Sequence, residues 1–296
     1  MSKKTIFTGA ATAIITPLTP DGIDYEAFGK LIDWQIESGI DALVVCGTTG
    51  EASTLIDEEH IDAIAFAVKR AHHRVPIIAG TGSNDTAHAI KLATLAEKAG
   101  ADALLVVTPY YNKTSQRGLI RYYTEIANSV SIPMILYNVP SRTGVNIEPS
   151  TYAALADIEN IVGIKEANGN LSKIVETMTL VNGKMDLYSG NDDQIVTLLS
   201  LGGVGVISVL SNLLPQKTHD MVARFLEGDV KASAALQFEL HELIGALFSD
   251  VNPIPVKAAM AKMGFCENYL RAPLVEMDEK AAEKLYDAMR AQGINI

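Results

Sequence analysis

The stretch GIDALVV at residues 39–45 recurs as GADALLVV at residues 100–107, and this internal repeat decides the fold. In each copy a glycine ends a helix-like segment, an aspartate turns the chain, and a short apolar run begins. The copies start at residues 39 and 100, so the interval holds two strand–helix units of about 30 residues each. The repeat therefore predicts a chain of alternating strands and helices.

Eight short apolar runs rich in β-branched residues mark the first two thirds of the chain. They are continuously apolar rather than alternating, which is typical of strands buried on both faces in a parallel sheet covered by helices. The runs span residues 11–15, 42–46, 76–79, 103–107, 133–137, 161–165, 186–189 and 204–209. Eight such units close into a (β/α)8 barrel more naturally than they form an open doubly wound sheet, which is the alternative.

Helical patterns fill the segments between these runs. Two apolar stripes with the spacing of a helix that docks on a sheet are Phe28, Leu31, Ile32 and Ile36, and Ile61, Ile64, Ala65 and Val68. From about residue 231 onward the strand patterns stop and helical ones continue, including residues 281–289. We therefore predict a barrel over residues 1–230 and a small C-terminal helical region over residues 231–296.

Composition excludes several classes of protein. The 296 residues are 48% hydrophobic and 20% charged, which is typical of a globular chain with a large core rather than a disordered one. The formal net charge is −11 and the basic residues are scattered, so we expect no binding of nucleic acid. No metal site is expected, because none of the six histidines ends a predicted strand.

The two cysteines and the N-terminal residues bear on the cellular compartment of the protein. Cys46 and Cys266 are too far apart in sequence for a metal motif, and we expect two buried, apolar thiols. The N-terminal residues lack the apolar core of a signal peptide, and no segment reaches the roughly 18 apolar residues that a membrane helix needs. We expect a protein of a reducing compartment, most simply the cytoplasm.

A lysine that ends a buried run is the sharpest candidate for chemistry, because catalytic groups of such barrels lie at the C-terminal ends of strands. Lys165 follows the run at residues 161–164, where desolvation lowers a lysine pKa and leaves more neutral, nucleophilic amine. Tyr137 ends the preceding strand, so its phenol can relay protons during imine formation. The alternatives are a lysine that snorkels to water and a core tyrosine.

Polar residues that follow other strands are suited to carboxylates. Thr48 and Thr49 lie between glycines and offer two hydroxyls, although a strand-to-helix turn with a threonine cap explains them equally well. Arg142 follows Tyr137 closely, and a guanidinium can hold a carboxylate with two hydrogen bonds, while most surface arginines only solvate a face. The pair at residues 110–111 is compatible with packing or with a contact between subunits.

Six motifs together carry a resemblance to a known family. They are GTTGE at 47–51, YNVPSRTG at 137–144, the Lys165 strand, YSGNDD at 188–193, GVISV at 205–209 and NPIPVK at 252–257. In this order the chain resembles the dihydrodipicolinate synthase family over nearly its whole length. That family is part of the superfamily of pyruvate-dependent class I aldolases, which also contains N-acetylneuraminate lyase. Arg142 in its SRTG context, with the doubled tyrosine at 110–111, favours the synthases.

The resemblance implies a reaction and a set of residue roles. Lys165 would form a Schiff base with pyruvate, whose carboxylate lies near Thr48 and Thr49, and the enamine would attack L-aspartate 4-semialdehyde in diaminopimelate and L-lysine biosynthesis. Arg142 would anchor the aldehyde substrate, and no external cofactor would be needed. The remaining implied roles are a proton relay of Tyr137, Thr48 and Tyr111, with Tyr111 donated by a neighbouring subunit, and backbone contacts at Gly190 and Ile207.

The resemblance also implies a homotetramer, arranged as a dimer of dimers, and a regulatory site. In feedback-sensitive relatives L-lysine binds at positions that correspond here to Ala52, Ser53, Asp57, His60, Asn84, His88 and Tyr110. Sensitive bacterial members usually carry a histidine at the position of Asp57 and a glutamate at that of His88. Because this chain lacks that glutamate, we predict weak or absent inhibition by lysine.

Two other functions fit the same residues. One is a related class I lyase or aldolase that acts on N-acetylneuraminate or 2-keto-3-deoxygluconate. The other is a non-catalytic barrel that binds a small keto acid.

Overall fold

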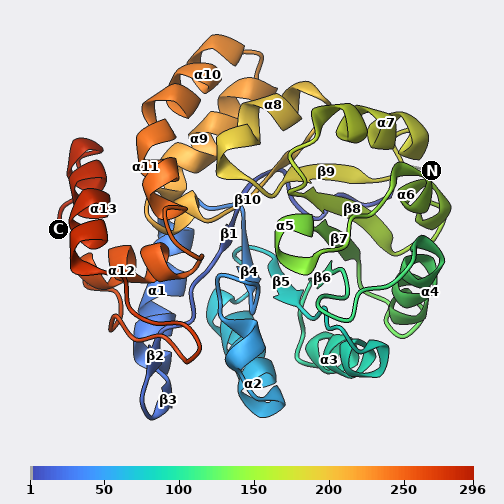
Figure 1. Cartoon of the computed structure of the whole chain (residues 1–296), viewed down its shortest axis with the longest axis horizontal. Helices are drawn as coiled ribbons and strands as arrows, with labels where there is room; N and C mark the ends of the chain where they lie inside the picture. The colour runs from blue at the N-terminus through green and yellow to red at the C-terminus, as the bar shows by residue number, and fades with distance from the viewer. Residues whose placement is uncertain (1–2) are drawn as a thin grey trace.

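A closed barrel of eight parallel strands surrounded by helices forms the body of the protein in a computed structural model, which describes residues 3–296 (Figure 1). The order around the barrel is β1-β10-β9-β8-β7-β6-β5-β4. The strands are β1 (Gly9–Ala13), β4 (Ala42–Val45), β5 (Ile77–Gly80), β6 (Ala103–Val107), β7 (Met134–Asn138), β8 (Ile161–Glu166), β9 (Asp186–Ser189) and β10 (Gly205–Ser208). The predicted (β/α)8 barrel is confirmed, and every predicted run overlaps one barrel strand.

A short antiparallel hairpin was not predicted. It consists of β2 (Leu18–Thr19) and β3 (Gly22–Ile23), which pair with each other outside the barrel. Strands of this length carry too few residues to produce an apolar pattern in the sequence.

The sequence repeat has the same structural role in both copies. Asp41 Oδ2 accepts a hydrogen bond of 2.7 Å from the amide of Ala10, and Asp102 Oδ2 accepts one of 2.8 Å from the amide of Ile77. Each aspartate thus ties the start of its own strand to the neighbouring strand. The glycines that open the two copies have φ values of 84° and 91°, a left-handed conformation that favours glycine. The repeat therefore encodes a turn that sets strand register.

Close backbone approach closes the barrel between its first and last strands. A Cβ on Gly205 would lie 2.2 Å from the carbonyl oxygen of Gly9, so only glycine fits at this position.

Alternate side chains of each strand face the barrel interior or the helices, as the pleat requires. On β7, Ile135 and Tyr137 belong to the inner apolar cluster, whereas Met134 and Leu136 belong to the outer layer beneath the helices. On β8, Ile164 belongs to the outer layer, so the next residue faces the interior. This alternation decides which polar residues at the strand ends reach the mouth of the barrel.

Helices connect the strands in turn. Those of the barrel are α1 (Tyr25–Glu37), α2 (Asp57–Ala71), α3 (Thr86–Lys98), α4 (Gln116–Ala127), α5 (Pro140–Thr143), α6 (Pro149–Leu155), α7 (Leu171–Val181), α8 (Ile195–Ser200) and α9 (Pro215–Leu226). Three short 3-10 helices are η1 (Ala52–Thr54), η2 (Asp192–Gln194) and η3 (Leu210–Asn212). On α1 the predicted stripe is buried at Phe28, Leu31 and Ile32.

The predicted stripe on α2 contacts the core, although Ile61 and Val68 are only partly buried there. Of its members only Ile64 is fully buried, and the buried face consists of His60, Ala63, Ile64, Ala67 and Ala71. Small alanine side chains let this helix lie close to the barrel, so they occupy the contact while larger residues flank it.

The chain ends in four helices that lie together on one side of the barrel (Figure 1). They are α10 (Val230–Glu239), α11 (His241–Leu247), α12 (Ile254–Lys262) and α13 (Glu279–Ala291), and α13 covers the helix predicted at residues 281–289. The division into a barrel of residues 1–230 and a helical region of residues 231–296 stays a prediction. Over residues 3–296, no helix is both long and apolar enough to cross a membrane.

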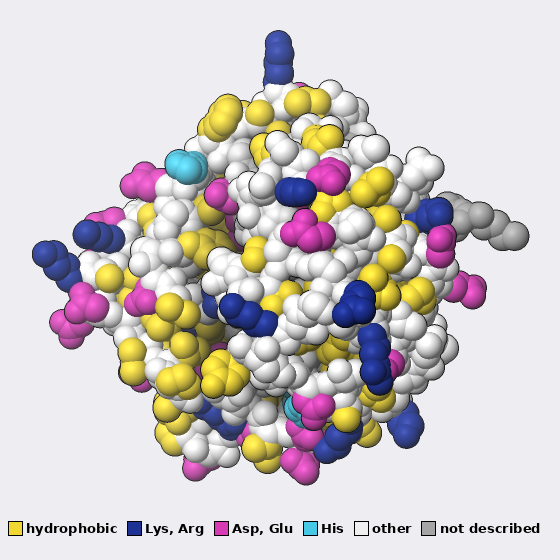
Figure 2. All heavy atoms as spheres, turned by 45° about the vertical axis from the view of Figure 1, so that its right-hand side comes forward, with side chains coloured by type: hydrophobic (Ala, Val, Ile, Leu, Met, Phe, Trp, Pro, Cys, Tyr) yellow, Lys and Arg dark blue, Asp and Glu magenta, His cyan; other side chains and the backbone are white. Residues whose placement is uncertain are grey.

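The two cysteines differ in burial. Cys46 is buried as predicted, but Cys266 is wrongly predicted as buried, since it lies partly exposed next to the C-terminal helices. Acidic and basic side chains are interspersed with apolar ones on the face drawn in Figure 2.

Candidate active site

Lys165 and Tyr137 face each other at the C-terminal ends of two neighbouring strands. They are register partners across β8 and β7, and the Lys165 amine lies 4.2 Å from the centre of the Tyr137 ring. The two residues are only 6% and 7% exposed, so the lysine does not snorkel to water. The structure therefore brings together the two residues that sequence reasoning placed at one mouth.

Burial sets the protonation of this pair. Desolvation lowers the pKa of Lys165 to about 7, opposed by the carboxylate of Asp192 and reinforced by the positive charge of Arg142. Desolvation also raises the pKa of Tyr137, against the smaller effects of Arg142 and of a hydrogen bond with Thr48. At neutral pH a large fraction of the amine is therefore uncharged, while the phenol keeps its proton. This combination suits a nucleophile beside a proton donor.

Gly190 makes room for the lysine. A Cβ at this position would lie 3.2 Å from Lys165 Cε and 2.9 Å from the Cβ of Ala167. The amide of Gly190 donates to the carbonyl oxygen of Glu166 at 2.8 Å, so only its carbonyl group is left to face a ligand. Ile207, the other predicted backbone contact, belongs to the inner cluster and is 1% exposed.

The two threonines after β4 have different environments. Thr48 is exposed and lines a cavity at the mouth of the barrel, whereas Thr49 is buried. The hydroxyl of Thr49 accepts a hydrogen bond of 3.0 Å from the side chain of Asn252, which belongs to the C-terminal part of the chain. Neither threonine caps a helix, because the residue that precedes η1 is Glu51. The predicted helix-cap alternative is therefore wrong.

Arg142 lies on α5, directly above Tyr137, and lines the same cavity. Its guanidinium donates to the carbonyl oxygen of Asn252 at 3.4 Å. Asn252 thus contacts Thr49 and Arg142, two of the three residues predicted to bind carboxylates. Sequence reasoning missed this role, although Asn252 opens one of the family motifs, because nothing local indicates that residue 252 returns to the barrel mouth.

Tyr111 lies outside the cavity that Thr48 and Tyr137 line within this chain. Its side chain is 90% exposed, its φ is 68°, and it is not among the residues that line the cavity. Tyr110 does line the cavity. A single chain therefore assembles only Tyr137 and Thr48 of the predicted three-residue relay.

The cavity has a volume of about 350 Å³ and extends from the barrel mouth to the space between α2 and α3. One end is lined by Thr48, Tyr137 and Arg142. The other end is lined by six of the seven residues of the predicted regulatory site, namely Ala52, Ser53, Asp57, His60, His88 and Tyr110. Asn84 does not line it. Three residues of the predicted active site thus share one cavity with the predicted regulatory residues, although Lys165 itself is not among the lining residues.

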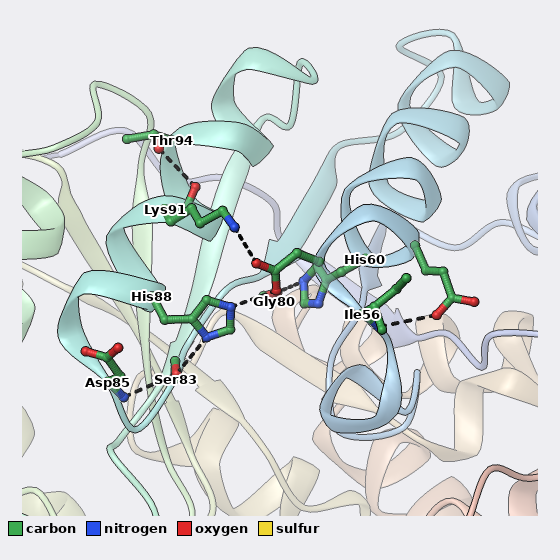
Figure 3. Close-up of polar contacts among 10 residues, drawn as sticks. Ile56, His60, Gly80, Ser83, Asp85, His88, Lys91 and Thr94 are labelled. Carbon is green, nitrogen blue, oxygen red and sulfur yellow. Dashed lines mark hydrogen bonds and ion pairs between the residues drawn. The ribbon is translucent and has the colours of Figure 1, made fainter.

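A charged cluster defines the far end of the cavity (Figure 3). Asp57 accepts a hydrogen bond of 2.6 Å from Lys91 and lies 2.8 Å from the ring of His88, which also contacts the Ser83 hydroxyl at 3.1 Å. The Lys91 and His88 hydrogen bonds lower the pKa of Asp57 to about 2. Asp57 is therefore a carboxylate whose two oxygens already have partners.

His60 lies beside this cluster, and its protonation state follows from burial. Its Nε2 is 2.7 Å from the carbonyl oxygen of Gly80, and burial lowers its pKa (Figure 3). The ring is therefore neutral at pH 7 and donates to that carbonyl group. Over residues 3–296, no group of three His, Cys, Asp or Glu side chains is arranged to hold a metal ion.

The chain is similar to proteins of one family throughout. The sequence profile of the Dihydrodipicolinate synthetase family matches residues 6–292. The 4-hydroxy-tetrahydrodipicolinate synthase of Lachnoclostridium phytofermentans is 55% identical over 291 residues, covering 98% of this chain and 99% of the relative.

Two solved structures are also similar to this chain. The chloride-inhibited dihydrodipicolinate synthase of Acinetobacter baumannii, complexed with pyruvate, superposes with a TM-score of 0.96 at 44% identity, covering 98% of this chain and 100% of that one. DHDPS from Cyanidioschyzon merolae with lysine bound gives a TM-score of 0.95 at 37% identity, covering 99% and 100% of the two chains.

Proposed function

The chain belongs to the dihydrodipicolinate synthetase family, and on this premise we propose that it condenses pyruvate with L-aspartate 4-semialdehyde to give 4-hydroxy-tetrahydrodipicolinate. This reaction is a lyase step of diaminopimelate and L-lysine biosynthesis. The observation that carries the proposal is the buried amine of Lys165, with a pKa lowered to about 7, next to the Tyr137 ring.

The chemistry begins at that amine. Neutral Lys165 attacks the ketone carbon of pyruvate, and loss of water leaves a protonated imine. Loss of a methyl proton gives an enamine, whose terminal carbon attacks the aldehyde carbon of the second substrate. The amino group of the condensed product then attacks the imine carbon, closes the ring and releases Lys165. Because the protonated imine accepts the electron pair, no external cofactor is needed.

The other residues bind and move protons. The Tyr137 phenol and the exposed Thr48 hydroxyl pass protons to and from the reacting oxygen. The Thr48–Thr49 loop receives the pyruvate carboxylate, and Arg142 receives the carboxylate of the aldehyde substrate. The carbonyl group of Gly190 and the backbone at Ile207 complete the pocket.

Borohydride reduction in the presence of pyruvate tests this function. The expected result is an added mass on the peptide that contains Lys165 in the wild type, and none in Lys165→Ala. Lys165→Arg is the matched control, since it keeps a positive charge but cannot form an imine. An unmodified wild-type lysine would overturn the proposal and leave a barrel that binds keto acids without catalysis.

Substrate assays separate the synthase from its sugar-acid relatives. We expect turnover of pyruvate with L-aspartate 4-semialdehyde, and no measurable cleavage of N-acetylneuraminate or 2-keto-3-deoxygluconate. Arg142 at the mouth supports the synthase reaction, since its guanidinium matches the carboxylate of L-aspartate 4-semialdehyde, whereas the aldehydes released from the two sugar acids carry no carboxylate. Preferential cleavage of either sugar acid would assign the protein to the other branch of the superfamily.

We propose a homotetramer, a dimer of dimers, in which Tyr111 enters the site of a neighbouring subunit. The 90% exposure of Tyr111 supports this assignment, because the ring is accessible to a neighbouring subunit and tyrosine is enriched at interfaces. Mixing Lys165→Ala with Tyr111→Phe subunits provides the test. If the relay crosses subunits, statistical mixing restores about a quarter of wild-type activity, because one site in each mixed dimer is intact. No recovery would contradict the exchange.

We also propose that L-lysine inhibits this protein weakly or not at all. At the far end of the cavity, Asp57 already pairs with Lys91 and His88, so no carboxylate is free to receive the ammonium of a lysine ligand. Initial rates without lysine and with about 1 to 10 mM lysine give the test. His88→Glu is the informative variant, since it should increase inhibition. A low-micromolar inhibition constant for the wild type would contradict the proposal.

A further inference from the structure

A second polar pair lies directly behind Lys165 and Tyr137, on the outer face of the same two strands. Asn138 and Glu166 are the next register partners after Tyr137 and Lys165, and the amide of Asn138 donates to both carboxylate oxygens of Glu166 at 2.9 and 3.2 Å. Because successive residues of a strand face opposite sides, this pair points into the layer between barrel and helices.

That layer is mostly apolar, so the carboxyl group of Glu166 must be stabilised there by hydrogen bonds. It is 2% exposed, and Asn138 is fully buried. Besides Asn138, it accepts hydrogen bonds from the Tyr152 hydroxyl at 3.0 Å and from the amide of Asn168 at 2.9 Å. Burying an acid is costly unless its oxygens are satisfied, and here four donor–acceptor contacts satisfy them.

The same pair also holds the loop that carries Arg142. The side chain of Asn138 donates to Asn146 Oδ1 at 2.9 Å and accepts from the amide of Ile147 at 3.1 Å. These residues lie at the end of the loop that begins after β7. Asn138 therefore connects the ends of β7 and β8 to the return of the Arg142 loop.

We propose that Asn138 and Glu166, together with Asn146 and Tyr152, form an outer clamp that positions Lys165, Tyr137 and the Arg142 loop for the reaction. The proposal rests on the proposed function. The members of the clamp are positioning residues, since they lie on the face of the strands opposite to the cavity. They act by fixing the last register step of β7 against β8, one residue beyond the reacting pair.

Two backbone hydrogen bonds and the close contact at Gly190 connect the clamp to the residues around Lys165. The carbonyl oxygen of Asn138 accepts from the amide of Ala167, and the carbonyl oxygen of Glu166 accepts from the amide of Gly190, at 2.9 and 2.8 Å. Gly190 in turn is the residue that leaves space for Lys165. A shift of the clamp is therefore a shift of the walls around the amine.

Reversing the direction of the hydrogen bond between Asn138 and Glu166 tests the proposal. Asn138→Asp places two carboxyl groups face to face and removes the donor to Asn146. We expect kcat to fall on the order of 10- to 100-fold, with slower borohydride trapping of pyruvate and a higher KM for the aldehyde, because small misplacements of reacting groups have effects of this size. In the double variant Asn138→Asp with Glu166→Gln, the amide introduced at position 166 donates to the carboxylate introduced at position 138, and we expect most of the loss to be recovered.

A matched control separates positioning from stability. Asn160 lies at the opposite end of the same strand pair, where its side chain donates to the carbonyl oxygens of Ala127 and Val130 at 2.8 and 3.1 Å. Asn160→Ala should lower the melting temperature and leave kcat and both KM values unchanged. If Asn138→Asp does not fold, Glu166→Gln alone carries the test, with an expected fall in kcat of about 3- to 10-fold.

The outcomes are distinct from those of the proposed function. Wild-type protein that neither traps pyruvate nor condenses the aldehyde would refute the function itself. Wild-type activity together with an unchanged kcat and trapping rate in folded Asn138→Asp would refute the clamp alone. Lost activity that the double variant does not recover would also refute it, because the cross-strand hydrogen bond would then not be the cause.

Discussion

The Lys165 amine lies 4.2 Å from the centre of the Tyr137 ring, and the two residues are direct partners across β8 and β7. The amine is therefore buried against an aromatic face, with a phenol hydroxyl in the same mouth and the charges of Asp192 and Arg142 nearby. This relationship makes the reaction sensitive to pH and to the loss of a single hydroxyl.

The pH dependence of imine formation follows from the pKa of Lys165. Since this pKa is lowered to about 7, the neutral fraction rises as pH increases through 7, and trapping of pyruvate should be half-maximal near that pH. For a lysine amine in water, the neutral fraction would still be rising at about pH 10. Initial trapping rates from about pH 5 to about pH 10 provide the measurement.

Glu166→Gln is the control for this profile, because burial raises the pKa of Glu166 to about 7 as well. The variant should react more slowly but keep the same midpoint. A midpoint that moved with this substitution would assign the titration to the carboxyl group instead of the amine.

Removal of the Tyr137 hydroxyl should slow turnover and leave the fold intact. Tyr137→Phe keeps the ring against Lys165 but loses the proton donor, so we expect kcat to fall by roughly 100-fold. Tyr123→Phe is the control, since Tyr123 is fully buried in the outer layer and does not face the cavity. Turnover of Tyr137→Phe at more than half the wild-type rate would contradict the relay.

Arg142 should act on the aldehyde substrate rather than on pyruvate. Arg142→Ala removes a guanidinium that can donate two hydrogen bonds to a carboxylate. The aldehyde KM should therefore rise on the order of 10-fold or more, while borohydride trapping of pyruvate continues. Arg121→Ala serves as the control, because Arg121 pairs with Glu125 on the exposed face of α4. If the aldehyde KM and kcat were unchanged in Arg142→Ala, this result would contradict the assignment of Arg142 to the aldehyde substrate.

A fully buried ion pair links α12 to the Thr48–Thr49 loop. Lys257 Nζ lies 2.7 Å from Glu51 Oε1, neither side chain is exposed, and the ammonium also donates to the carbonyl oxygen of Thr16 at 2.6 Å. Lys257→Met should lower the free energy of unfolding by about 3 to 5 kcal/mol, because it leaves a buried carboxylate without a cation.

Urea denaturation measures this loss. The double variant Lys257→Met with Glu51→Gln should regain a large part of the stability, since it removes the orphaned charge. If Lys257→Met were as stable as the wild type, the pair would contribute nothing to folding.

Much of this architecture is encoded locally. The eight apolar runs, the glycine–aspartate repeat and the helical stripe of α1 each follow from side-chain pattern within a few residues, and each corresponds to an element of the barrel. The strand ends also pointed to Lys165 and Tyr137, because parallel strands deliver their C-terminal residues to one mouth. The small hairpin was not predictable, since its two-residue strands leave no periodic signal. The stripe predicted on α2 shares only Ile64 with the buried face of that helix, which consists mainly of alanines.

The sequence by itself determined which residue types stand at the ends of the strands, because the pleat and the apolar runs are local properties. Only the tertiary structure decided which of them meet. Asn252 reaches Thr49 and Arg142 from the far end of the chain, Glu166 lies behind Lys165 against Tyr152, and Tyr111 is exposed instead of lining the cavity. Such contacts join residues distant in sequence, and they depend on how helices pack around the closed barrel rather than on any pattern within one segment.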